Sequence, residues 1–474
     1  MPKLSGRLAV LTLCLIVAAP VASAAARPLP GTTPRAAPVA AASVSRFDSE
    51  SGPAVVAAGA IVPGSVNRAS LAVTATYAVD AAIAVSTGVI KVATTINATN
   101  HSGAGVDRFE LNTIATRLGS PFSITSASVD GSPVTATVSD QTLLVPLGGV
   151  LPDGSSTQIK IGYLATLRTG TTGSNWMFTR YNGTLAMYRW IPWVSLNRPF
   201  DRPNHGDPFV TPSSPSVSVK LTLDRSMVVA APGASLPTAL SKTWQFTMAN
   251  VRDVNLVLAP DFTVTRSTVN GIAVRAYSRP GGYSGTKLGD VSRAALAKEA
   301  TRLGVAYPWA SFTVVETAGG YGLESPSMVW IPSNTASASL TYLVYHEIAH
   351  QWFYGMVGND QQREPFADEG AADMLARTVL GTLRGSRCAK DELDRRITGY
   401  SSSCYYETIY VQGANKLNSL RSTIGTTAFW NAIRTYLNAN KFKLSTTKKL
   451  LEAIRAATSV NLVPTLHARF PTLY

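Results

Sequence analysis

Two kinds of hydrophobic pattern divide the chain near residue 275. From residue 59 to 275, apolar and polar residues alternate in short runs that Gly, Asp and Pro interrupt. This alternation is typical of half-buried strands. Strands are expected in segments 70–79, 87–99, 123–140, 157–167, 216–224 and 244–259, with a hairpin turn at Asp130-Gly131. Many short strands at close spacing predict an all-β, sandwich-like N-terminal domain over residues 59–275.

The pattern beyond residue 275 is mostly helical. Nine of the 11 glutamates follow residue 290, and Glu is favoured in helices and depleted in strands. Two short apolar runs, at 312–318 and 327–332, predict strands. Helices are expected at 290–304, 338–357, 369–383, 413–425, 427–440 and 447–458. Strands followed mainly by helices predict an α+β domain over residues 276–474.

The N-terminus has the layout of an export signal. Lys3 and Arg7 precede an apolar run at residues 8–17, and the small residues Ala22-Ser23-Ala24 follow it. This run is too short to span a bilayer, so residues 1–26 are predicted to be a cleaved signal peptide. Residues 27–58, rich in Ala and Pro, are expected to form a linker. The mature protein is therefore expected to be secreted or periplasmic, with no transmembrane segment.

Composition narrows the classes of protein further. Hydrophobic residues make up 45% of the 474 residues, which excludes a disordered or fibrous chain. The net charge is +14, yet no run of five like charges and no nucleic-acid-binding motif occurs. We therefore expect no nucleic-acid partner. A scattered basic surface permits weak association with an anionic cell envelope, and a surface with no specific partner is the alternative.

Two cysteines remain after removal of the signal peptide. Cys388 and Cys404 lie 16 residues apart. An even pair in a chain exported to oxidising conditions predicts one disulfide, with two unpaired thiols as the alternative.

The segment His346-Glu347-Ile348-Ala349-His350 carries the strongest chemical signal. On a helix, residues four apart project from one face, so both imidazoles can bind the same ion. This HExxH pattern supplies two zinc ligands and a general base, Glu347. A pair of histidines buried in a core is the alternative.

Catalytic zinc usually has three protein ligands, so a third is needed. Glu369 lies 19 positions after His350 in the segment ADEGAADM and is the predicted third ligand. Asp368 is the competing carboxylate, with the N-cap of a helix as its other role. Asp373 is on the same helix face as Glu369. It is expected to accept a hydrogen bond from a ligand histidine, or else to be a solvated helix position.

These motifs together resemble a known family. HExxH-x18-E resembles the gluzincin zinc metallopeptidases of the aminopeptidase N type. GGYGLESP is similar to that family's GxMEN loop, which implies that Glu324, with Gly322 beside it, binds the substrate's α-amino group. YVQGANKL is similar to the Y-x-K-G-A motif, which implies that Tyr410 supports the oxyanion. The resemblance implies one Zn²⁺ per chain and a thermolysin-like catalytic domain, in a short form without the family's long C-terminal helical domain.

Several positions depart from the family pattern. Ser325 stands in place of Asn or Tyr, Tyr321 in place of the loop's first Gly, and Gln412 in place of Lys. No acidic residue lies near 181–184, where the family usually adds a second amine anchor. Tyr405 and Tyr406 compete with Tyr410 by sequence alone. The aromatic residues between 176 and 200 are expected to line substrate subsites or a carbohydrate-binding face, or else to fill a core where the two domains meet.

The predicted function is hydrolysis of peptide bonds by a zinc-dependent aminopeptidase acting on peptide substrates. A zinc endopeptidase with an open cleft is the first alternative. An inactive envelope-binding relative is the second.

Overall fold

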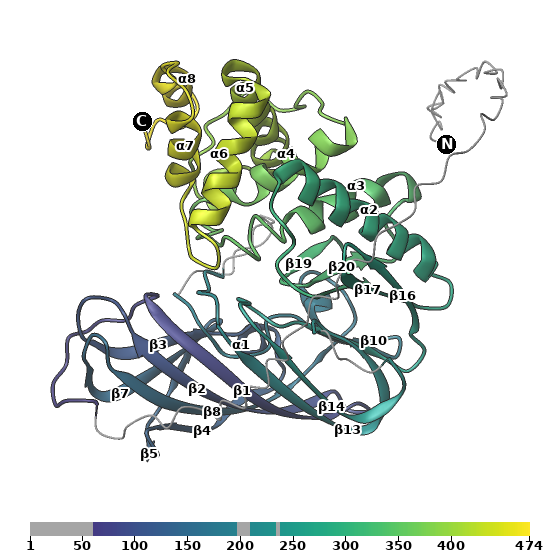
Figure 1. Cartoon of the computed structure of the whole chain (residues 1–474). Coiled ribbons are helices and arrows are strands. Elements are labelled where there is room, and N and C mark those ends of the chain that lie inside the picture. The colour runs from purple at the N-terminus through teal and green to yellow at the C-terminus, as the bar shows by residue number, and fades with distance from the viewer. Residues whose placement is uncertain (1–59, 197–208, 234–237) are drawn as a thin grey trace, which may run out of the picture. The chain divides into compact units, whose positions relative to one another are not determined.

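The structure, a computed structural model, describes residues 60–196, 209–233 and 238–474 (Figure 1). The predicted signal peptide and linker lie outside the described residues and stay predictions. Within the described ranges, no helix is both long and apolar enough to cross a membrane.

Eleven strands form the larger sheet of the N-terminal region. They pair in the order β5-β4-β8-β2-β1-β13-β15-β11-β10-β9, and β14 pairs with β13. Alternate residues of β1 are buried, as the sequence pattern predicted. The strands are β1 (Val73–Ala84), β2 (Val89–Asn100), β4 (Phe122–Val129), β5 (Ser132–Pro133), β8 (Ser156–Thr166), β9 (Arg168–Thr169), β10 (Phe178–Tyr181), β11 (Thr184–Met187), β13 (Val217–Ala230), β14 (Ser241–Met248) and β15 (Leu256–Ala259).

A second sheet of four strands completes this region. Its order is β12-β3-β7-β6, formed by Trp193–Val194, Val106–Asn112, Thr142–Leu151 and Thr137–Ser139. The ring of Tyr77 on β1 stacks on Trp193 of β12, with ring centroids 4.0 Å apart. The two sheets therefore share an apolar core, and the prediction of a sheet-rich N-terminal region is confirmed. A short helix, α1 (Ala115–Leu118), follows β3.

The predicted hairpin turn at Asp130-Gly131 is present. Val129 pairs with Ser132, and both turn residues have positive φ, 49° for Asp130 and 84° for Gly131. Asp tolerates this conformation and Gly adopts it without steric cost, which is why this dipeptide favours a two-residue turn.

The second region begins with a five-stranded sheet, in the order β16-β17-β18-β20-β19. Its strands are β16 (Thr263–Val269), β17 (Ile272–Ser278), β18 (Ser311–Thr317), β19 (Leu323–Ser325) and β20 (Met328–Pro332). The predicted domain boundary between residues 275 and 276 falls inside β17, whose pairing with β18 joins it and β16 to this sheet. The pattern of apolar and polar residues could not show that β16 and β17 belong to this sheet, because it is like the pattern of the strands before them.

Helices make up most of the rest of the chain, as predicted. In Figure 1, α2 (Gly285–Leu303) and α3 (Ser337–Ala349) lie beside the five-stranded sheet. Ser284 caps α2 at its start, and Gly304 ends it with φ 62°. The other helices are α4 (Glu369–Leu380), α5 (Gly413–Ile424), α6 (Thr426–Ala439), α7 (Thr447–Ala456) and α8 (Val463–His467), with single turns η1 (Asn175–Met177), η2 (Pro365–Ala367), η3 (Ile397–Gly399) and η4 (Glu407–Gln412).

The helix that carries the HExxH segment is shorter than predicted. It was expected to run to residue 357, but α3 ends at Ala349. Beyond α3 the backbone hydrogen bonds join residues five apart, as from Gly355 N–H to the His350 carbonyl oxygen at 2.8 Å. Tyr354, within this segment, has φ 146°. The residues after the helix stay buried, so the hydrophobic pattern continued although the helix did not. Gly355 lies so close to Trp309 that an added Cβ would be 2.9 Å from the indole ring.

Candidate metal centre

The two histidines of the HExxH segment meet at the end of α3. His346 lies in its last turn, and His350 is the C-cap residue. Their Nε2 atoms are 3.3 Å apart, and the rings meet edge to face. Both side chains are buried. One helix turn therefore aims two imidazole nitrogens at the same point, as the four-residue spacing predicted.

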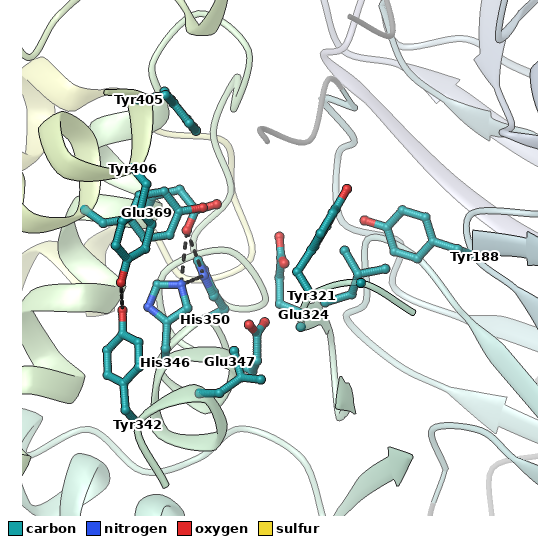
Figure 2. A pocket seen from close by; sticks show the side chains of 15 residues that line it. Tyr188, Tyr321, Glu324, Tyr342, His346, Glu347, His350, Glu369, Tyr405 and Tyr406 are labelled. Carbon is teal, nitrogen blue, oxygen red and sulfur yellow. Dashed lines mark hydrogen bonds and ion pairs between the residues drawn. The ribbon is translucent and has the colours of Figure 1, made fainter. Parts of the chain in front are cut away.

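Glu369, the first residue of α4, brings a carboxylate to this point. Its Oε2 lies 3.3 Å from His346 Nε2 and 3.2 Å from His350 Nε2 (Figure 2). Three ligands held about 2.0–2.1 Å from a tetrahedral ion lie about 3.3 Å from one another. The two nitrogens and one oxygen of this triangle therefore fit a zinc ion in both type and spacing.

Asp368 faces the other side of His350. Its Oδ1 lies 2.7 Å from His350 Nδ1, and Gln361 Nε2 donates a hydrogen bond to its Oδ2. The side chain makes no capping bond at the start of α4. Asp368 thus makes no capping bond, and it faces Nδ1 of His350 rather than the triangle of His346, His350 and Glu369. It holds the outer nitrogen of His350, which leaves Nε2 directed at the metal position.

Asp373 does not make the hydrogen bond predicted for it. Its Oδ1 is 3.7 Å from His346 Nδ1, longer than a hydrogen bond. Instead it accepts hydrogen bonds from Tyr342 Oη and from Arg377 Nε, the latter at 2.6 Å. Because the side chain is fully buried, it is not a solvated helix position either. The Arg377 charge, four residues further along α4, holds it away from the histidine.

A pocket of about 410 Å³ opens over the triangle. Figure 2 shows Glu324 and Glu347 facing the same space as His350. Tyrosine and carboxylate side chains dominate the lining, which consists of Tyr188, Gly320, Tyr321, Gly322, Leu323, Glu324, Tyr342, Leu343, His346, Glu347, His350, Glu369, Tyr405, Tyr406 and Tyr410. All seven residues predicted as ligands, base, oxyanion donor or substrate contacts therefore line one cavity.

Glu347 lies beside the triangle and is buried. Burial raises the pKa of its carboxyl well above the ordinary value, and the negative charges of Glu324 and Glu369 add to the rise. The backbone of Gly322 packs against it, since a Cβ added there would lie 2.1 Å from Glu347 Oε1. Only glycine leaves room for this carboxylate, which gives Gly322 a local reason beyond its predicted contact with substrate.

Glu324 lies on β19, the edge strand of the five-stranded sheet. It pairs in register with Val329 and is buried within the pocket wall. Gln361 Nε2 donates a hydrogen bond to its Oε1 at 3.1 Å. The same amide nitrogen contacts Asp368, so Gln361 connects the predicted amine anchor with the residue that holds His350. No sequence motif indicated Gln361, because its position in the loop before η2 has no local period.

Tyr410 lies in η4, a single π-helical turn, and its ring stacks on His346 with centroids 5.2 Å apart. Burial and the negative charge of Glu369 raise the pKa of its hydroxyl, which keeps the proton available for donation. Its two rivals line the same pocket. Tyr406 is held by other partners, with its Oη 2.8 Å from Tyr342 Oη and 2.9 Å from Arg377 Nη2.

The aromatic segment fills a core and also reaches the pocket. Trp176 meets Tyr321 edge to face, and an added Cβ on Gly319 would lie 2.1 Å from its ring. Tyr188 packs against Trp330 of β20 and lines the pocket. Packing in a core is therefore confirmed for Trp176 and Tyr188, and the role in substrate subsites stays a prediction. Phe200 lies outside the described residues.

The predicted disulfide between Cys388 and Cys404 is formed, with the Cα atoms 5.9 Å apart. It closes a loop between α4 and η4, the turn that carries Tyr410.

Comparisons with known proteins agree with this architecture. The sequence matches no protein-family model. The structure is similar to an M1 zinc metallopeptidase from Deinococcus radiodurans, with a TM-score of 0.65 and 17% identity over 86% of this chain and 95% of that one. A variant of that enzyme bound to a Tyr-Ser-Ala substrate gives a TM-score of 0.62 and 16% identity, over 84% and 94% of the chains. At this identity the likeness is one of fold, a sheet-rich region followed by a helical one.

Proposed function

We propose that this protein is a zinc-dependent peptidase that removes residues from the N-terminus of peptides. The observation that carries the proposal is the buried triangle of His346 Nε2, His350 Nε2 and Glu369 Oε2, with edges of 3.2–3.3 Å. A second carboxylate, Glu347, stands beside it in a pocket large enough for a peptide end. The fold shared with M1 zinc metallopeptidases supports the same function.

One zinc ion per chain is the proposed cofactor, held by His346, His350 and Glu369. When bound, zinc supplies Lewis acidity and lowers the pKa of a water ligand to about 7. Histidine nitrogens with one carboxylate oxygen are the donor set typical of catalytic zinc. Asp368 supports this role, since it holds His350 Nδ1 and so fixes the direction of Nε2.

Glu347 is the proposed general base and then general acid. Its carboxylate takes a proton from the attacking water and delivers it to the amine nitrogen that leaves. Burial raises the pKa of this carboxyl above its ordinary value, which makes it a stronger proton acceptor than an exposed glutamate. Tyr410, which keeps its proton, is placed to donate a hydrogen bond to the oxyanion of the tetrahedral intermediate.

Glu324 is the proposed anchor for the free α-amino group. A buried carboxylate in the pocket wall attracts an ammonium group, and its contact with Gln361 orients it. A peptide held in this way presents its first peptide bond to the metal centre. The relative bound to a Tyr-Ser-Ala substrate supports peptides as the substrate class.

We also propose that the mature chain is exported after removal of residues 1–26. The proposal depends on the sequence of the N-terminus and on the Cys388–Cys404 disulfide, which oxidising compartments favour. We propose in addition that the α+β domain is thermolysin-like and that the exported protein associates weakly with an anionic cell envelope.

Matched peptides with free and acetylated N-termini test the function. We expect the free peptides to be cut one residue at a time, the acetylated ones to be poor substrates, and a chelator to stop hydrolysis of both. Equal cleavage of the two sets would indicate the endopeptidase alternative instead. No hydrolysis by a chain that contains zinc would favour the inactive relative.

Glu324→Gln separates the anchor from the metal chemistry. We expect cleavage of free peptides to slow by about ten- to hundredfold, since a charge-assisted hydrogen bond contributes about 1.5–3 kcal/mol. The zinc content and the slow cleavage of acetylated peptides should stay unchanged. An equal loss on both substrate sets would show that Glu324 does not act through the amine.

A further inference from the structure

A second hollow, of about 370 Å³, lies in the helical region and shares no lining residue with the metal-centre pocket. Three parts of the chain form it: the loop closed by the disulfide, the start of α5, and the segment around α8. We call it the cationic hollow. Its lining consists of Ser386, Cys388, Lys390, Gln412, Asn415, Lys416, Ser419, Thr465, Ala468 and Arg469.

Three cations face this space, Lys390, Lys416 and Arg469, and no carboxylate is among the lining residues. The side chains of Lys416 and Arg469 are each only 7% exposed, whereas Lys390 is at the surface. In the described part of the chain, none of the three forms an ion pair. The negative charge of Asp391 acts on Arg469, but the Asp391 carboxylate forms its ion pair with Arg395, at 3.2 Å.

The buried lysine is held by neutral groups. Lys416 Nζ donates to the carbonyl oxygen and to the hydroxyl of Thr465, the latter at 3.0 Å. Burial first, and then the positive charges of Arg469 and Lys390, together lower the pKa of Lys416 to about 8. Holding such a group charged among like charges is unfavourable unless an anion joins them.

Donors remain for such an anion. A lysine ammonium has three N–H donors, and Lys416 spends two on Thr465. A guanidinium has five, and Arg469 spends Nε on the Asp391 carbonyl and Nη2 on Gln412 Oε1. These two bonds use two of the five N–H donors of Arg469, and the remaining donors are available to a ligand in the hollow. Two anchored cations and one movable lysine around a small space match the several acceptor oxygens of a tetrahedral oxyanion.

We infer that the cationic hollow is a binding site for a small multivalent oxyanion of the phosphate class. Three positive charges favour a dianion over a monovalent carboxylate, because each added unit of negative charge interacts with all three cations. The site is separate from the proposed metal centre, since the two pockets share no lining residue.

Thermal unfolding of the zinc-loaded protein at pH 7 tests the inference. Inorganic phosphate and glycerol phosphate are titrated separately, with sodium acetate at matched ionic strength as the reference. We expect phosphate to raise the melting temperature in a saturable way, while acetate has little effect. A similar rise with glycerol phosphate identifies a phosphomonoester as a ligand, and a rise with inorganic phosphate alone identifies the free ion.

Variants assign the effect to the hollow. Lys390→Met removes the exposed cation without disturbing packing, and Lys416→Met removes the buried one. Each should weaken phosphate binding at least tenfold, whereas Lys298→Met, which removes an exposed charge on α2, should not. Equal binding by the wild type and Lys390→Met would overturn the inference, and so would a shift that acetate reproduces. Phosphate bound at the zinc ion would persist in both hollow variants and would count against the site.

Discussion

At the scale of single residues, the two ring nitrogens of His350 have different partners. Nδ1 faces Asp368 at 2.7 Å, and Nε2 faces Glu369 and His346. Although burial by itself lowers the pKa of this imidazole, the carboxylates around it, Asp368 first among them, raise it well above the ordinary value. The two carboxylates therefore have different roles around His350: Asp368 bonds to the ring, and Glu369 can bind the same metal ion as the ring.

Glu347→Gln and His350→Ala should have different effects on metal and activity. The first variant keeps every proposed ligand but loses the base, so zinc should stay and hydrolysis should fall by at least a hundredfold. The second variant removes a ligand and should lose the ion. Metal analysis beside a peptide-cleavage assay measures both. A Glu347→Gln chain with undiminished turnover would rule out the proposed role of this carboxylate.

Asp368→Asn should weaken zinc binding by about 10–100-fold, because partners of ligand histidines typically contribute this much. Asp373→Asn is the matched control, since its oxygen lies 3.7 Å from His346 and its main partner is Arg377. Competition with a chelator of known affinity measures both constants. Equal weakening in the two variants would contradict the assignment of Asp368 as the residue that holds a ligand.

At the scale of elements, the segment from the end of α4 to η4 surrounds one carboxylate. Arg384 and Arg387 both bond to Glu407, which is the first residue of η4, and the Cys388–Cys404 disulfide closes the same loop. Glu407 lies one helical turn before Tyr410. The contacts of this loop with Glu407 therefore help to fix the position of Tyr410, the proposed oxyanion donor.

This carboxylate should make stability depend on pH in the acid range. Hydrogen bonds from Arg384, then from Arg387, lower the pKa of Glu407 from 4.5 to about 2, against the opposing effect of burial. A group whose pKa is lower in the folded state stabilises that state above its unfolded pKa, and the contribution is lost as pH falls towards 2.

Glu407→Gln should therefore cost about 1.5–3 kcal/mol of unfolding free energy at pH 7, towards the lower end because Arg387 is exposed. The difference between variant and wild type should shrink below about pH 4.5. Urea denaturation at a series of pH values measures it. A difference that is constant from pH 7 to 3 would show that the charge of Glu407 is not its cause.

At the scale of the whole molecule, a buried polar network joins the sheet-rich region to the metal-centre loops. Asp253 accepts hydrogen bonds from Tyr354, which follows α3, and from Ser325, which is next to Glu324. Arg189 donates to the Tyr354 hydroxyl at 2.7 Å and lies 3.8 Å from Asp253. Ser325, a departure from the family pattern, is thus a point of contact between the N-terminal region and β19, the strand of the proposed amine anchor.

Asp253→Asn should destabilise the protein by about 3–5 kcal/mol, because it removes one partner of the buried Arg189–Asp253 ion pair. It should also lower catalytic efficiency on free peptides while zinc is retained, since β19 loses a contact. Asp80→Asn is the control, for Asp80 is 61% exposed in its pair with Lys220 and should change stability little. Unfolding curves with unchanged midpoints for Asp253→Asn would contradict the role of the network.

Local pattern determined much of this protein by itself. The alternation of apolar and polar residues predicted the strands, and the four-residue spacing of His346 and His350 predicted their shared target. The paired cysteines predicted their bond. The first two features follow from the side-chain periodicity of a single helix or strand, and the third follows from there being two cysteines to pair. The sequence therefore contains the information needed to predict them.

Tertiary structure decided what depends on distant parts of the chain. It placed Glu369 beside Nε2 of His350, at the proposed metal position, and Asp368 beside Nδ1, because the start of α4 turns one carboxylate to each side of the ring. It ended α3 at Ala349, although the residues that follow are buried like those of the helix. It also brought Gln361, Asp253 and the three cations of the cationic hollow close to residues that are distant in the sequence. Such contacts form only when separate elements pack, and hydrophobic periodicity does not encode which polar groups then meet.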